Sequence, residues 1–80
     1  MEEVILGLVS EAYANLSKSS KEYEKRQIIE TLIRNIKESL TTTPYTMEFR
    51  EIEGHWVYSI AWLEENKVRM KVLDFKNPRR

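Results

Sequence analysis

His55 is the side chain in this sequence best suited to moving a proton, because imidazole titrates near neutral pH. It is the only histidine among the 80 residues, and it directly follows Gly54. We therefore expect it beside a turn, at the start of a strand. One interpretation gives His55 a catalytic or recognition role, and the other makes it an ordinary solvated turn residue.

The second candidate for chemistry is a basic cluster near residue 80. Lys76, Arg79 and Arg80 surround the pair Asn77-Pro78, where contacts to phosphate groups are easy to place. A frayed, solubilising tail is the alternative interpretation of the same three residues.

The composition excludes several other kinds of site. The sequence has no Cys, which rules out a disulfide framework and Cys-based zinc sites, and one His cannot form a metal-binding His cluster. Paired-carboxylate, Ser/His/Asp and Gly-rich phosphate-loop patterns are also absent from the sequence. We therefore expect no metal and no cofactor.

The charge balance bears on possible partners. Thirteen basic and thirteen acidic residues give a formal net charge of zero, so the chain lacks the global attraction to phosphate of basic nucleic-acid binders. The apolar run from Val4 to Val9 is too short to span a bilayer and lacks the basic flank of a secretion signal. The sequence thus predicts a cytoplasmic protein with no membrane partner.

Two stretches before residue 41 have the spacing of amphipathic helices. Between residues 2 and 16, apolar residues recur at three- and four-residue intervals, at Ile5, Leu8, Ala12 and Leu16. The run Val4 to Val9 is also compatible with a short buried strand. Ser19 and Glu22 have the spacing of a capping box, which predicts a second helix from about residue 20 to Leu40.

Residues 45–75 read as three antiparallel strands in a row. Glu53-Gly54 predicts a two-residue turn that places Ile52 opposite His55. For the next hairpin we predict a three-residue loop, residues 64–66, which places Ile60 opposite Met70. Both hairpins then share one apolar face, made of Tyr45, Met47, Phe49, Trp56, Tyr58, Ile60, Trp62, Val68, Met70 and Val72.

A two-residue turn at Glu65-Asn66 is the alternative for the second hairpin. It would place Arg69 and Lys71 among the aromatic side chains, a combination typical of a nucleic-acid platform. We expect the three-residue loop, because the alternative moves Val68, Met70 and Val72 to the opposite face from Met47 and Phe49.

The sequence therefore predicts a single α+β domain over residues 1–80. Its helical hairpin, residues 2–40, is expected to pack on one face of the three-stranded sheet, residues 45–75, with a basic tail at 76–80 and, as an alternative, an extra N-terminal strand. On the back of the sheet we expect an apolar corner of Ile52, Val57, Leu73 and Phe75 beside His55. Such a corner indicates a protein partner or a twofold dimer contact, or else it is covered by the tail or by a helix edge.

The final third of the chain, VYSIAWLEENKVRMKVLDFKNPRR, resembles the C-terminal sheet of RelE/ParE-type toxins. In that family a helical hairpin precedes antiparallel strands, a Tyr-containing strand leads through a tight hairpin to an apolar strand, and a basic tail follows. The strand with Tyr58 and the tail at 76–80 take these places here. Family members usually open with a strand, which favours the strand interpretation of Val4 to Val9. They commonly carry an Arg where this sequence has His55, and the mRNA-cleaving members are typically basic.

The resemblance implies ribosome-dependent mRNA cleavage or gyrase poisoning, with an antitoxin segment wrapped around the toxin. On this first hypothesis His55 moves a proton on the back face while Arg69 and Lys71 stabilise the developing charge. The RNA or ribosome contacts would come from Lys76, Arg79 and Arg80. A degenerate or repurposed relative is equally compatible.

The second hypothesis is a non-catalytic interaction module, cellular or viral. It would form a homodimer or bind a protein partner through Ile52, Val57, Leu73 and Phe75.

Overall fold

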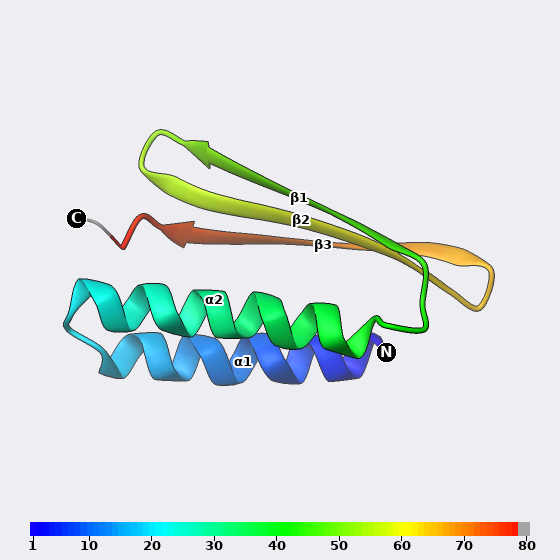
Figure 1. Cartoon of the computed structure of the whole chain (residues 1–80), viewed down its shortest axis with the longest axis horizontal. Coiled ribbons are helices and arrows are strands. Elements are labelled where there is room, and N and C mark those ends of the chain that lie inside the picture. Colours follow the sequence, from blue (N-terminus) through cyan, green and yellow to red (C-terminus); the bar gives the residue numbers. More distant parts are fainter. Residues whose placement is uncertain (79–80) are drawn as a thin grey trace. The chain divides into compact units, whose positions relative to one another are not determined.

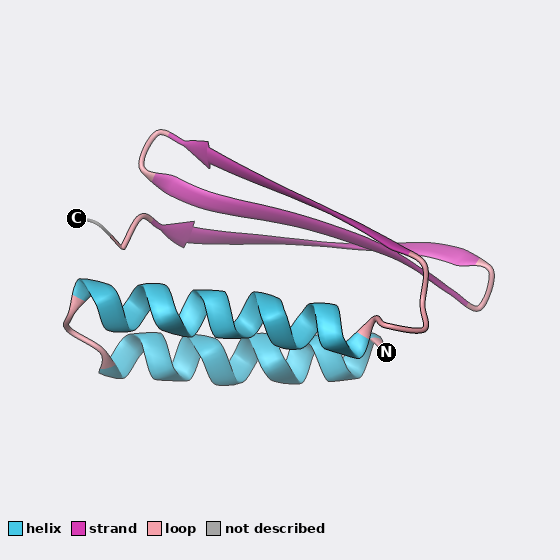
Figure 2. Cartoon of the chain, viewed as in Figure 1, coloured by secondary structure: helices cyan, strands magenta, loops and turns pink. Residues whose placement is uncertain are grey.

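Two helices precede three strands in the computed structural model, which describes residues 1–78 (Figures 1 and 2). The elements are α1 (Glu2–Lys18), α2 (Glu22–Ser39), β1 (Tyr45–Ile52), β2 (His55–Glu64) and β3 (Lys67–Lys76). The predicted α+β class is confirmed. Contacts divide the chain into a helical unit, residues 1–41, and a sheet unit, residues 42–77.

The helical unit is a hairpin in which α1 and α2 run side by side (Figure 1). Apolar residues at helical spacing supply its buried side chains: Ile5, Val9 and Ala12 from α1, and Ile29, Leu32, Ile33 and Ile36 from α2. The run Val4 to Val9 lies inside α1, so the alternative of a short N-terminal strand is wrong. Its buried members follow the helical period and not the alternation of a strand.

The connection between the helices differs from the predicted capping box. Ser19 ends α1 as its C-cap, and its Oγ donates a hydrogen bond to the Asn15 carbonyl oxygen at 3.1 Å. The N-cap of α2 is Lys21, which has no side-chain capping bond. The box does not form because the Ser19 hydroxyl bonds back to the preceding turn, a common alternative for serine.

The sheet unit is an antiparallel meander in the order β1-β2-β3. The predicted register of the first hairpin is confirmed, with Ile52 opposite His55 and Phe49 opposite Tyr58. Glu53 and Gly54 form the turn with φ angles of 46° and 80°. Positive φ at both central residues gives the backbone twist that joins two neighbouring strands most directly.

The predicted register of the second hairpin is wrong by one residue. Glu65 and Asn66 form a two-residue turn with φ angles of 52° and 63°, so Glu64 pairs with Lys67. Ile60 therefore lies opposite Lys71, and not opposite Met70. A shift of one residue moves every side chain of β3 to the other face of the sheet.

A polar network joins the end of β3 to the first hairpin. The backbone N–H of Asn77 donates to the Gly54 carbonyl oxygen at 2.6 Å, and its Nδ2 donates to Glu51 Oε1 at 2.7 Å. The Trp56 indole N–H donates to the same carboxylate oxygen at 3.4 Å. Asn77 is buried, so its side chain depends on protein partners more than an exposed amide would.

Candidate functional site

The register gives the sheet one buried and one exposed face, because side chains alternate along each strand. We call the side with buried Trp56, Ile60, Trp62, Leu73 and Phe75 the buried face. The other side, the exposed face, carries Thr46, Glu48, Arg50 and Ile52 from β1; His55, Val57, Ser59, Ala61 and Leu63 from β2; and Val68, Met70, Val72, Asp74 and Lys76 from β3. His55, Asp74 and Lys76 lie where β2 begins and β3 ends, which we call the polar end although Ile52 is also there, and Leu63, Val68, Met70 and Val72 lie toward the β2–β3 turn.

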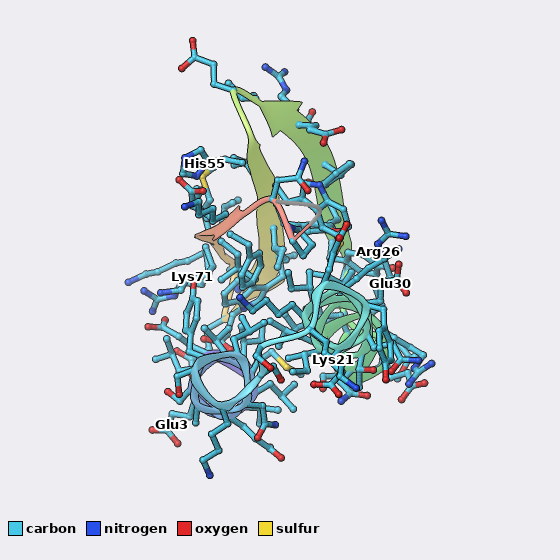
Figure 3. The ribbon with its side chains drawn as sticks, turned by 90° about the vertical axis from the view of Figure 1, so that its left-hand side faces the viewer. Glu3, Lys21, Arg26, Glu30, His55 and Lys71 are labelled. Carbon is cyan, nitrogen blue, oxygen red and sulfur yellow. The ribbon has the colours of Figure 1, made fainter. Side chains whose placement is uncertain are left out.

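His55 lies at the polar end of the exposed face and projects from the sheet (Figure 3). Its Nδ1 is 2.8 Å from Oδ1 of Asp74, and both side chains are about half exposed. An ionised carboxylate can only accept, so Nδ1 carries the proton in this bond. In the neutral ring Nε2 then has the lone pair, and the carboxylate holds the ring in place. This arrangement suits a general base.

Two cations share the face of His55. Lys76 is its direct cross-strand partner on β3. Arg50, on β1, lies 3.7 Å from the Glu48 carboxylate. Sequence reasoning missed Asp74, because only the correct β3 register places Asp74 on the His55 face.

The other residues of the predicted catalytic set lie elsewhere. Arg69 and Lys71 are on the buried face, where Arg69 Nε is 3.9 Å from Oε2 of Glu64. The expected back-face grouping of His55 with Arg69 and Lys71 is therefore wrong, because the β2–β3 register differs by one residue from the predicted one. The predicted RNA contacts Arg79 and Arg80 lie outside the described residues.

The predicted apolar corner for a protein partner is also divided, because the β3 register differs by one residue from the predicted one. Ile52 and Val57 lie on the exposed face, whereas Leu73 and Phe75 are only 1% and 4% exposed on the buried face. The four residues do not form one patch, and this prediction is wrong as a geometric grouping.

A different apolar patch occupies the exposed face. We call it the apolar end: Leu63 (43% exposed), Val68 (73%), Met70 (69%) and Val72 (54%). Leu63 pairs with Val68, and the small residues Ala61 and Ser59 pair with Met70 and Val72, which makes the patch continuous across β2 and β3. The sequence signal that would have found it is Glu65-Asn66, a turn pair comparable to Glu53-Gly54.

The buried face combines basic and aromatic residues, but its two Trp rings are not available for stacking, and its exposed aromatic side chains are Phe49 (50%) and Tyr45 (39%) on β1. Trp56 and Trp62 are only 6% and 3% exposed, so a nucleic-acid base has no access to their rings. The rings of Phe49 and Tyr58 pack against each other at 4.8 Å between centroids. Trp62 Nε1 is buried and has no hydrogen-bond partner among the described residues.

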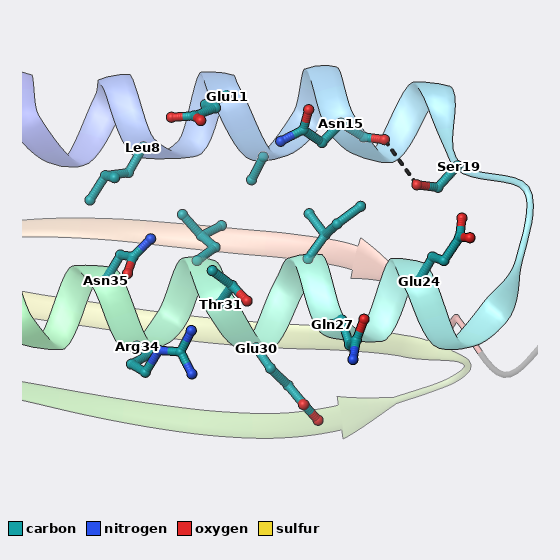
Figure 4. Close-up of a pocket in the computed structure, with 13 residues that line it drawn as sticks. Leu8, Glu11, Asn15, Ser19, Glu24, Gln27, Glu30, Thr31, Arg34 and Asn35 are labelled. Carbon is teal, nitrogen blue, oxygen red and sulfur yellow. Dashed lines mark hydrogen bonds between the residues drawn. The ribbon is translucent and has the colours of Figure 1, made fainter.

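The helical unit has a groove of about 700 Å³ between α1 and α2 (Figure 4). Its polar lining includes Glu11 and Asn15 of α1 and Glu24, Gln27 and Asn35 of α2. Figure 4 shows these side chains dispersed along the groove, without convergence on one point. In residues 1–78 no three His, Cys, Asp or Glu side chains are grouped so that they could hold a metal ion.

Neither α1 nor α2, the helices of the described residues, is long and apolar enough to cross a membrane. Searches of protein-family models, of curated proteins and of solved structures found no match to this chain.

Proposed function

We propose that this chain is a protein-interaction module that binds through the apolar end of its exposed face. The exposure of Leu63, Val68, Met70 and Val72 on one sheet face carries the proposal. Fully burying a Val, Leu or Met side chain is favourable by about 1.5–3 kcal/mol. Covering four such exposed side chains with a partner would therefore contribute substantially to the free energy of binding. Contiguous exposed apolar patches of this kind mark interaction sites in soluble domains.

The shape of the patch also supports an interface. Ala61 and Ser59 are small and lie in the middle of the sheet, beside the larger Met70 and Val72 of β3. A partner can therefore approach the central strand closely while β3 supplies the apolar contacts. On the exposed face itself, the charged residues nearest to the patch are Glu48 and Asp74, which lie toward the polar end, where a rim of charge would fix the partner's orientation.

The proposal is tested by cross-linking the tagged chain to its neighbours in its source cells. Val72→Lys places a charge in the patch, and Val4→Lys is the matched control, because Val4 is 50% exposed on α1 and Val72 is 54% exposed. We expect Val72→Lys to abolish the main cross-linked species, whether self or foreign, and Val4→Lys to retain it. Identical species from both variants would refute the proposal.

A second candidate function is RNA cleavage in the manner of RelE toxins, and the His55–Asp74 hydrogen bond favours it. Nε2 of His55 would take the proton of a ribose 2′-hydroxyl as its oxygen attacks the adjacent phosphorus. The bond to the 5′-oxygen breaks, and that oxygen takes a proton from water. Lys76 and Arg50 would stabilise the charge on the phosphate. Such an activity belongs in the cytoplasm, on ribosome-bound mRNA, and an antitoxin would be its partner.

The structure supplies a discriminating test for this candidate. Lys76 shares the face of His55, and Lys71 lies on the opposite face. With translating ribosomes as substrate, His55→Ala should abolish cleavage and Lys76→Ala should lower it at least about tenfold, while Lys71→Ala leaves it unchanged. Cleavage that persists in His55→Ala would exclude this chemistry.

A further inference from the structure

We infer that the occupant of the exposed face is a second copy of this chain, packed face to face about a twofold axis. This inference rests on the proposed function, since both need the apolar end. Three observations support a second copy: the charge balance of the face, the pattern of residues along it, and the protection of the sheet edge beside it.

The charge of the exposed face allows it to meet itself. Its acidic residues are Glu48 and Asp74 and its basic residues are Arg50 and Lys76, which is two against two and leaves a net charge of zero apart from His55. A face of one sign would repel its own copy, and a face built for nucleic acid would be clearly positive. Neutrality with both signs present is what an isologous contact requires.

The order of residues along β2 and β3 selects an antiparallel arrangement. An axis that crosses the strands at the level of Ile60 and Lys71 lays Met70 and Val72 of one copy on Val72 and Met70 of the other, and places Val68 beside the partner copy's Asp74. Counting outward in steps of two residues places Met70 on the partner copy's Val72 and Leu63 on its Val57. The same count brings Glu65 of the turn close to His55 and Lys76 of the second copy. Opposite charges thus meet where the apolar contact ends.

The edge of the sheet argues against the other common mode of self-association, in which β3 of two copies would pair. Arg69 and Lys71 sit on this edge strand and point to the buried face, and Lys67 adds a third cation to β3. Charges of one sign along an edge strand, including inward-pointing ones, discourage edge-to-edge pairing. These charges disfavour pairing through β3, which agrees with a contact through the face.

The area of the face sets the strength of the dimer. Ten residues at about 3.3 Å each and three strands at about 4.8 Å give a flat footprint of roughly 450–500 Å² per copy. Specific interfaces bury about 800 Å² per partner, and weak ones less than about 600. The footprint belongs to the class of small, weak interfaces, so we expect a reversible dimer.

Sedimentation velocity of the full chain, from about 1 µM to about 1 mM, tests the inference. We expect a monomer–dimer equilibrium that saturates at the dimer. Val72→Lys should weaken it about tenfold or more, while Val4→Lys leaves it unchanged. Both valines are exposed, so both variants should retain the wild-type circular dichroism spectrum.

A charge exchange tests the direction of the two copies. Glu65→Lys and Lys76→Glu should each weaken the dimer severalfold, and the double variant should recover the wild-type dissociation constant. A chain that stays monomeric, grows beyond the dimer, or shows no recovery in the double variant overturns the inference. If the chain is monomeric but a foreign partner is lost in Val72→Lys and kept in Val4→Lys, the interaction module stands and the second copy is refuted.

Discussion

Asn77 joins the end of the sheet to its first hairpin, and its removal should destabilise the fold measurably. Its Nδ2 donates to Glu51 Oε1 at 2.7 Å, and its backbone N–H donates to the Gly54 carbonyl oxygen. Asn77→Ala deletes the side-chain bond and keeps the backbone bond. A hydrogen bond to a charged group contributes about 1.5–3 kcal/mol.

We expect the lower end of that range, because Glu51 is exposed and water can replace one of its donors. A loss of about 1.5 kcal/mol lowers Tm by about 6–12 °C in a domain of this size. Thermal unfolding followed by circular dichroism measures this shift. The measurement belongs at a protein concentration where the chain is monomeric, since association raises Tm.

The control is Lys76→Ala, which removes the exposed neighbour of Asn77 and should change stability by less than about 0.5 kcal/mol. A double-mutant cycle with Glu51→Ala isolates the pair, and we expect a coupling of about 1 kcal/mol. Additive effects of Asn77→Ala and Glu51→Ala, or an unchanged Tm in Asn77→Ala, would refute the role of this contact.

Three further predictions test the sheet. In this cysteine-free chain, Ser59→Cys with Val72→Cys should form a disulfide on mild oxidation, because the two residues are direct cross-strand partners; failure to cross-link in a mass measurement would contradict the register. Gly54→Ala should cost about 1–2 kcal/mol in denaturant unfolding and Glu65→Gly should stabilise by up to about 1 kcal/mol, because both positions have positive φ; the reverse order would contradict the turn geometry. Leu73→Ala should cost about 2–5 kcal/mol in the same assay, because Leu73 is 1% exposed, and a loss below about 1 kcal/mol would place it outside the core.

Local sequence signals predicted the second helix and the first hairpin, and they left residues 4–9 open between helix and strand. Of the predicted helical set, Ile5 and Ala12 are buried and Leu8 and Leu16 are partly exposed, while Val9, one residue after Leu8, is also buried. Glu53-Gly54 offers a glycine where the turn needs positive φ, so one turn type dominates and fixes the pairing of Ile52 with His55. In both cases the deciding interaction lies within a few residues of the signal.

The second hairpin shows where such reasoning stops. Two registers competed there, and the predicted one gathered Val68 and Met70 with the other apolar residues on one face. The structure instead buries Leu73 and Phe75 beside Trp56 and leaves Val68 and Met70 exposed. Grouping all apolar residues on one face favours the wrong register here, because this sheet leaves Val68 and Met70 exposed.

The face-to-face dimer and RNA cleavage by His55 cannot operate at the same time, because both use the exposed face. Antiparallel packing brings Glu65 of one copy close to His55 of the other, where a carboxylate and the covering sheet would keep a phosphate away from Nε2. Only the monomer would then cleave RNA with the His55–Asp74 pair. The cleavage rate per chain would fall as the protein concentration rises above the dissociation constant of the dimer. An interaction module without catalysis has no such constraint, and its His55 gains a partner on dimerisation. The register of β3 that exposes Met70 and Val72 also brings Asp74 to His55, so both proposals depend on the same register.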